Sequence, residues 1–101
     1  MDASIFLMGL PECMTRVLRE KRYEIASSQV SATLILADES VVDQVGAGVR
    51  ANTVVLYRHG TALTPADVFR FGKQGFADVQ RQPCEAQTLL DIVEKALAPK
   101  P

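Results

Sequence analysis

The sequence is poor in the residues that build metal centres, and it has no long apolar run. Two cysteines and one histidine occur in 101 residues. Cys13 and Cys84 stand far apart with no ligand-like neighbours, so no zinc spacing exists. No run approaches the roughly 20 apolar residues of a membrane span, and residues 1–9 lack the basic start of a signal peptide. We expect a cytoplasmic protein with reduced thiols, no metal, no cofactor and no membrane contact.

Charge and length restrict the function further. The formal net charge is −1, from 11 basic and 12 acidic residues, so we expect no direct binding to nucleic acid. The densest basic group, at 19–22, stands at the end of an expected helix, where cations suit the helix dipole. A chain of 101 residues, 48% of them hydrophobic, fits one globular domain. We assign residues 1–97 to this domain and interpret 98–101 as a linker-like tail.

Short apolar runs alternate with amphipathic segments along most of the chain. Continuous apolar runs of about five residues at 4–8, 33–37 and 53–57 predict strands buried on both faces. Two further strands are expected at 23–27, which alternates weakly, and at 76–79, a short final strand. Helical spacing and capping residues predict helices over 11–21, 40–49, 64 to 72 or 75, and 85–97. This alternation predicts a three-layer α/β sandwich with a parallel sheet of four or five strands.

One junction departs from the alternation. Only about five residues separate the expected strands at 23–27 and 33–37, whereas a parallel crossover needs roughly a dozen. One crossover helix is therefore shortened or absent. Alternatively, residues 31–45 form a helix and 49–57 form the third strand, which gives four strands and regular alternation. The strand-like composition of 33–37 favours the first interpretation.

The last third of the sequence resembles one family. Gly75, Asp78 and Pro83 stand in the order and spacing of a glycine, an acidic residue and a proline in the receiver domains of response regulators. An amphipathic helix with the Leu-Leu pair at 89–90 follows, as it does in receivers. This segment is the most specific part of the resemblance.

The preceding strands resemble the same family. Residues 54–60 resemble the fourth receiver strand and its switch, and residues 33–38 resemble the third strand, which ends at the phosphoacceptor aspartate. Asp38 then corresponds to the acceptor. The resemblance covers nearly the whole chain, and it implies a flavodoxin-like fold and a role in bacterial signal transduction.

Other residues occupy the positions that complete the phosphorylation pocket of a receiver. Receivers bind Mg²⁺ through an acidic pair after the first strand, where this chain has Gly9 and Leu10, neither with a side-chain oxygen. The lysine that pairs with the phosphoryl group corresponds to Gln82, and the switch threonine or serine corresponds to Tyr57. Phosphoryl transfer depends on stabilisation by metal and cation. The resemblance therefore implies a degenerate pseudo-receiver with no catalytic residue.

Three features leave other chemistry open. Asp38 can cap the following helix instead of accepting a phosphoryl group. Cys13 stands near the first strand-to-helix turn, like the cysteine of phosphotransferase IIB phosphocarriers, although Glu12 opposes a thiolate there. Arg58 and His59 follow a strand at the edge where open α/β sheets bind ligands. A nucleotide or anion site at that edge would also draw on Arg16, Arg50 and Arg81.

We expect a non-enzymatic interaction or dimerisation module in signal transduction or transcription regulation, independent of phosphorylation. Its surface would comprise the helix from Pro65, the last strand and the helix from Glu85, the face with which receivers commonly form dimers or dock effectors. The residues expected on this face are Phe69, Arg70, Lys73, Gln80, Arg81 and Gln87. The missing crossover helix also predicts an apolar sheet face that a second copy covers, and hence a homodimer.

Overall fold

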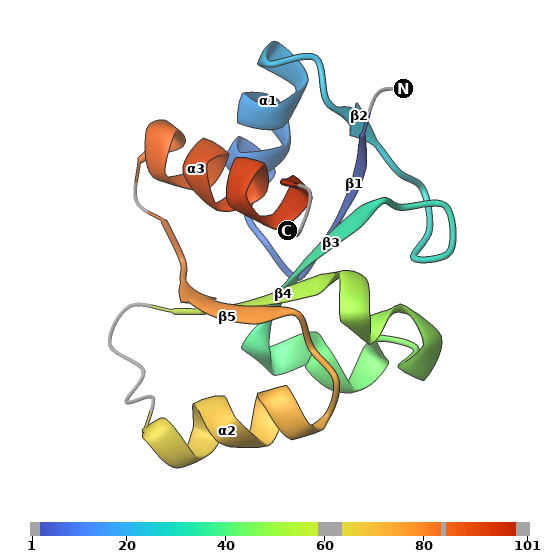
Figure 1. The fold of residues 1–101 in the computed structure, drawn as a ribbon. Helices are drawn as coiled ribbons and strands as arrows, with labels where there is room; N and C mark the ends of the chain where they lie inside the picture. The colour runs from blue at the N-terminus through green and yellow to red at the C-terminus, as the bar shows by residue number, and fades with distance from the viewer. Residues whose placement is uncertain (1–2, 59–63, 84, 99–101) are drawn as a thin grey trace.

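A five-stranded parallel sheet forms the centre of the molecule (Figure 1). The computed structural model describes residues 3–58, 64–83 and 85–98. The strands are β1 (Ser4–Met8), β2 (Glu24–Ile25), β3 (Leu34–Asp38), β4 (Thr53–Tyr57) and β5 (Asp78–Arg81). They lie in the order β2-β1-β3-β4-β5, and each neighbouring pair is parallel. The predicted sheet is confirmed with five strands.

Helical segments cover both faces of the sheet and complete three layers (Figure 1). Two α-helices, α1 (Glu12–Glu20) and α3 (Ala86–Leu97), pack on one face. The other face carries α2 (Pro65–Lys73) and two 3₁₀ helices, η1 (Glu39–Gln44) and η2 (Ala47–Asn52). None of the described helices combines the length and the apolar character needed to cross a membrane.

The central strand β3 is buried along its whole length. Leu34 and Leu36 join the core under α1 and α3, while Ile35 and Ala37 join the core on the opposite face. A strand between β1 and β4 with both faces covered needs apolar residues at successive positions. The alternative interpretation, a helix over 31–45, is therefore wrong, because residues 34–38 of that segment form the central strand β3.

The connection between β2 and β3 crosses the sheet without a helix. The strand β2 pairs only with Ser4 and Ile5, at the beginning of β1. The chain therefore needs no long return before β3 starts opposite Ile5, and a loop over residues 26–33 suffices. This loop is fixed to β1, since the Ser4 hydroxyl donates to the Ser31 carbonyl (2.9 Å) and the Thr33 N–H donates to the Ser4 carbonyl (2.8 Å).

The helix predicted over 40–49 is replaced by η1 and η2. Gly46 does not end a continuous helix. It stands at the amino-terminal cap of η2 in an extended conformation. Val41 and Val42 of η1 pack against the core. The apolar residues that suggested an α-helix therefore make core contacts from a short 3₁₀ helix.

The last strand begins two residues later than predicted. Gly75 adopts a φ of +94°, a left-handed conformation that glycine tolerates, and it turns the chain at the end of α2. Phe76 then enters the core, where its ring meets Phe71 edge to face at a centroid distance of 6.0 Å. Phe76 is therefore a core residue of the connection, and β5 pairs with β4 from Asp78 onward.

Candidate functional site

Asp38 ends β3 at the carboxyl edge of the sheet, and its side chain is fully buried. A buried carboxylate without hydrogen-bond donors costs several kcal/mol of stability. Its Oδ2 accepts a hydrogen bond from the Ser40 backbone N–H at 3.1 Å and another from the Ser40 hydroxyl. Asp38 thus caps η1, and the capping prediction is confirmed.

Two further side chains approach the other carboxylate oxygen of Asp38. Gln82, which follows β5, donates a hydrogen bond from Nε2 to Oδ1. Arg58, which follows β4, forms an ion pair in which Nε lies 3.4 Å from Oδ1, and its side chain is 66% exposed. The two carboxylate oxygens offer about four lone-pair positions, and four donors approach them. Asp38 is therefore saturated by groups of its own chain.

The role of Arg58 at this site was not predicted from the sequence. Gln82 entered the prediction through its correspondence with the receiver lysine, whereas Arg58 was considered only as part of an anion site. The register of the sheet pairs Asp38 with Leu56, which brings Arg58, two residues further on, to the same edge. The contact between Arg58 and Asp38 could have been predicted only with this register of β3 against β4 in hand.

Gly9 lies directly against Asp38. It adopts a φ of +68°, and a Cβ atom built on it would lie 3.3 Å from the Cβ of Asp38 and 3.1 Å from Cγ2 of Val41. Backbone strain and steric contact therefore both oppose a side chain at this position. Leu10 follows and packs, partly buried, against the core under α1 and α3.

These residues do not fit a Mg²⁺ ion. Mg²⁺ requires oxygen ligands in near-octahedral geometry. N–H and O–H donors occupy the Asp38 oxygens, while Gly9 and Leu10 have no side-chain oxygen. Among the residues that the structure describes, no group of three or more His, Cys, Asp or Glu side chains is placed to hold a metal. The Asp38 carboxylate thus accepts its hydrogen bonds and its ion pair from groups of its own chain.

Tyr57 occupies the end of β4, and the sequence resemblance assigns it to the position of the receiver switch. It pairs with Arg81 of β5 in the sheet register, and the Arg81 guanidinium carbon lies 5.7 Å from the centre of the Tyr57 ring. This distance is within the range of a cation–π interaction. The bulky ring is thus held by the neighbouring strand at the same edge as Asp38.

The helix α2 presents an apolar and basic surface. Phe69 is 65% exposed, and the Lys73 ammonium lies 4.9 Å from the centre of its ring. Arg70 forms an ion pair with Asp67, with Nη2 3.5 Å from Oδ1, and lies over the Phe71 ring. Three residues predicted for the interaction face, Phe69, Arg70 and Lys73, therefore share one helix.

A capping box fixes the start of α2. Thr64 Oγ1 accepts from the Asp67 N–H at 3.3 Å, and Asp67 Oδ2 accepts from the Thr64 N–H at 3.1 Å. The Thr64 backbone N–H, and after it the Thr64 hydroxyl, lower the pKa of Asp67. Desolvation opposes this lowering of the pKa, and the charge of Arg70 adds to the lowering as the smallest of the four contributions. The capping box predicted at this position is confirmed.

The strand β5 and the helix α3 continue the predicted face. The edge strand β5 runs between α2 and α3 (Figure 1). Gln80 donates from Nε2 to Oδ2 of Asp78 at 2.8 Å, and Gln87 donates from Nε2 to Oδ1 of Asp91 at 2.9 Å. The six predicted residues thus lie on the adjoining elements α2, β5 and α3.

The other candidate residues do not gather at one place. Arg50 belongs to η2, before β4 begins, and donates to the Gln74 carbonyl at 3.3 Å. It is therefore at the opposite edge of the sheet from Arg58 and Arg81. Cys13 is exposed in the first turn of α1, so it is not in a loop directly after a strand. His59 and Cys84 lie outside the described residues.

The architecture is that of the receiver domains of response regulators. Across 96% of its length the chain superposes on NtrX from Brucella abortus with a TM-score of 0.72 and 16% identity, covering 27% of that chain. It superposes on a signal receiver domain from Vibrio parahaemolyticus, over 96% of this chain and 91% of that one, with a TM-score of 0.68 and 16% identity. It also superposes on a response regulator protein from Burkholderia multivorans, over 100% of this chain and 99% of that one, with a TM-score of 0.65 and 16% identity.

The chain therefore has the receiver fold that its sequence resembles. It spans about a quarter of the NtrX chain and nearly all of the other two. No protein-family model matches the sequence, and no curated protein matches it.

The ion pair between Arg58 and Asp38 can be measured by a double-mutant cycle. Arg58→Met removes one donor from a buried carboxylate, and we expect it to lower the free energy of unfolding by about 1–2 kcal/mol. In Asp38→Asn the same arginine substitution should have a smaller effect, which gives a coupling energy of roughly 0.5–2 kcal/mol. Arg16→Met on α1 is the control. Additive effects in urea unfolding would contradict the coupling.

The capping box of α2 predicts a pH dependence. Because the folded-state pKa of Asp67 is lowered, its stabilising effect is present above the unfolded-state pKa and is lost as pH falls through the folded value. We expect Asp67→Asn to be less stable than the parent at neutral pH, with a difference that shrinks below about pH 4. Thermal unfolding between neutral and acidic pH measures it, and a difference that stays constant across this range would refute the assignment.

Proposed function

We propose that this domain is a pseudo-receiver: a non-enzymatic interaction module in bacterial signal transduction or transcription regulation that works without phosphorylation. One observation carries the proposal. The carboxylate at the acceptor position, Asp38, is buried and takes four donors from its own chain. An attacking carboxylate needs a free oxygen that faces the phosphoryl donor, and Asp38 offers none.

The charges around Asp38 support the same proposal. In phosphoryl transfer, metal ions and cationic side chains stabilise the charge of the transferred group. Here Gln82 is neutral, and Arg58 is engaged by Asp38 itself. Gly9 leaves no space for an acidic ligand beside Asp38, because Val41 occupies it. The charge of Asp38 is thus balanced by groups of its own chain.

The interaction surface that we propose is the face of α2, β5 and α3. Its support is the exposed ring of Phe69 next to the cations of Arg70 and Lys73 on α2. An exposed aromatic side chain with basic neighbours suits a partner that offers an apolar pocket with acidic groups at its rim. Such a partner would be an effector domain or another protein.

We also propose a homodimer through the sheet face that the missing crossover helix leaves open. Phe6 and Met8 of β1 point to this side and are only partly buried, and Val30 in the β2–β3 loop is 89% exposed. Apolar side chains in such a position are stabilised when a second copy removes them from water.

A beryllofluoride titration tests the absence of phosphorylation. With Mg²⁺, beryllofluoride mimics an acyl phosphate on a receiver aspartate. We expect amide NMR spectra with both reagents to match the buffer control, because the Asp38 oxygens are occupied. A phosphorylatable receiver domain measured in parallel is the positive control. Specific shifts at Asp38, Tyr57 and Arg81 would show a working acceptor and overturn the proposal.

Light scattering tests the homodimer and its surface. We expect a dimeric mass at high protein concentration, and a monomeric mass for Val30→Asp, because a charge at an exposed position opposes burial in the interface. Phe69→Asp, on α2, is the matched control and should remain dimeric. A monomeric parent would refute the homodimer, and dissociation by Phe69→Asp alone would refute the proposed surface.

A further inference from the structure

Two of the three large apolar side chains that are exposed within the described residues occupy consecutive positions of α2. Val68 is 45% exposed and Phe69 is 65% exposed, whereas the third, Val30, lies in the β2–β3 loop. Neighbouring apolar side chains exposed on one helix are typical of a surface that a partner covers. This part of α2 is therefore the apolar centre of the proposed interaction surface.

Gly72 leaves a gap beside these two side chains. It follows Val68 by four positions and Phe69 by three, so it is the neighbour of both on the helix surface. A Cβ atom built on Gly72 would meet nothing within 4 Å, and the turn at the end of α2 is made by Gly75, which has a φ of +94°. Neither packing nor the turn requires glycine at position 72, although glycine is unfavourable inside a helix. A glycine that the fold does not need indicates the close approach of another chain.

Val68, Phe69 and Gly72 form what we call the outer flank of α2, which faces away from the 3₁₀ helices. Arg70 and Gln74 line a cavity of about 290 Å³ together with residues of η1, so their side of the helix faces η1. At about 100° per residue, Val68 and Gly72 point to the opposite side. The helix η1 contacts β3 and β4, and the described sheet ends at β5, next to α2 (Figure 1). The outer flank therefore faces the side on which the described sheet ends.

Two cations stand at the ends of the outer flank. Lys73 belongs to the last turn of α2. Val79 of β5 packs into the core on the α2 side of the sheet, so Arg81, two residues later, is on that side too. Because α2 leads from the carboxyl edge of β4 back to the amino edge of β5, Arg81 is near its beginning and Lys73 is at its end.

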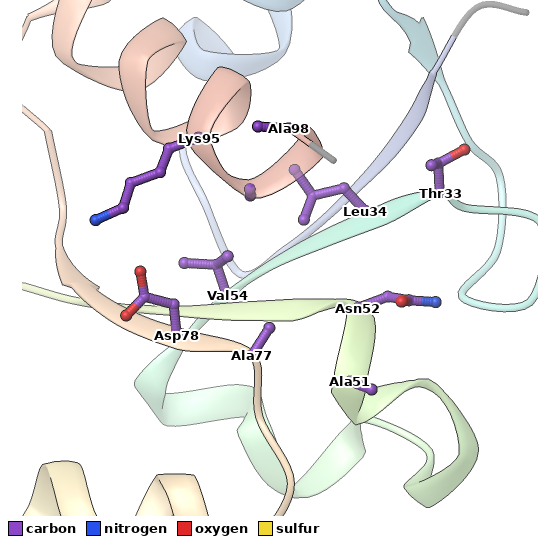
Figure 2. A pocket seen from close by; sticks show the side chains of 10 residues that line it. Thr33, Leu34, Ala51, Asn52, Val54, Ala77, Asp78, Lys95 and Ala98 are labelled. Atoms are coloured by element: carbon purple, nitrogen blue, oxygen red, sulfur yellow. The ribbon is translucent and has the colours of Figure 1, made fainter. Parts of the chain in front are cut away.

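No carboxylate of the described residues neutralises these two cations. Within 3–58, 64–83 and 85–98, neither Lys73 nor Arg81 forms an ion pair. Asp78 is an acidic residue of the same strand as Arg81, but Figure 2 shows its carboxylate on the other side of β5, directed toward α3 and Lys95. The outer flank is thus an apolar surface with a free positive charge at each end, which complements a partner that has acidic groups around an apolar stripe.

We propose that the outer flank of α2 binds an amphipathic α-helix of a partner protein. The apolar stripe of that helix covers Val68 and Phe69, one of its large apolar side chains fills the gap at Gly72, and its acidic residues face Lys73 and Arg81. A helix suits this flank, because the side-chain ridges of one helix fit the grooves of another, and the gap at Gly72 lets the two axes approach closely. The proposal rests on the proposed function, since it names the class of partner for the surface of α2, β5 and α3.

The probe for the test is a synthetic helical peptide, titrated into the complete chain and followed by two-dimensional amide NMR. This acidic probe has about 18 residues, with leucine at every third or fourth position and glutamate on both sides of the leucine stripe. We expect saturable shifts at Val68, Phe69, Gly72 and Lys73, with a Kd of roughly 0.1–1 mM. A version with lysine in place of glutamate, and a version with a central proline that breaks the helix, should each bind at least about fivefold more weakly.

Variants at Gly72 separate binding from folding. Gly72→Ala should raise the melting temperature by about 3–6 °C, because alanine favours the helix and its Cβ has free space. The same variant should weaken binding of the acidic probe about fivefold or more, because the Cβ enters the gap. Gly48→Ala is the matched control, since a Cβ on Gly48 in η2 also meets nothing within 4 Å, and it should bind the probe like the parent. Lys73→Met should weaken the acidic probe about fivefold and leave the lysine version unchanged.

Three results would overturn the proposal. The first is the absence of saturable shifts with the acidic probe. The second is equal binding of the acidic probe and its proline version, or unchanged binding by Gly72→Ala, because neither a helix nor the gap would then be recognised. The third is a set of shifts confined to the amides of residues 78–81, which would indicate an extended segment added to the edge of β5.

The same data separate this proposal from the proposed function. Shifts on α2 that are insensitive to Gly72→Ala and to the proline in the probe would refute the helical partner and leave the surface of α2, β5 and α3 in place. Saturable shifts outside these three elements would refute the surface itself.

Discussion

The burial of the Asp38 carboxylate is the constraint on which the carboxyl edge of this domain depends. The strand β3 lies in the middle of the sheet with both faces covered, so its last residue is carried into the interior. A charge in that position must find donors. Ser40 of η1, Arg58 after β4 and Gln82 after β5 supply them. One carboxylate therefore holds three separate segments together.

This internal neutralisation supports our proposed function. The family that this sequence resembles surrounds its aspartate with metal ions and a lysine, which leave the aspartate free to react when the receiver is phosphorylatable. In this chain Gln82 and Arg58 bind the carboxylate, and Gly9, which the resemblance assigns to a metal-ligand position, packs against Asp38 and Val41. Under this proposal the domain communicates through binding at its surfaces, since a conformational equilibrium shifts only when a ligand binds one state better.

The β2–β3 connection has no crossover helix because β2 is short. Because β2 covers only the first two residues of β1, the chain can pass under β1 with a loop. In the described residues the helical segments on that face are η1, η2 and α2, and Ala32 of the β2–β3 loop packs beside them. Phe6 and Met8 remain partly exposed as a result. Under our proposal of a homodimer, a second copy of the chain covers these side chains.

The sequence alone determined the elements whose signals are local. Continuous apolar runs placed β1, β3 and β4, and the capping box at Thr64 placed the start of α2, because these patterns depend on near neighbours in the chain. The tertiary structure decided what depends on register and packing. The contact of Arg58 with Asp38, the entry of Phe76 into the core and the position of Arg81 on the α2 side of the sheet each join residues that are distant in sequence. Which side chains meet at a sheet edge, and which flank of a helix stays uncovered, is set only when the strands are aligned and the helices packed.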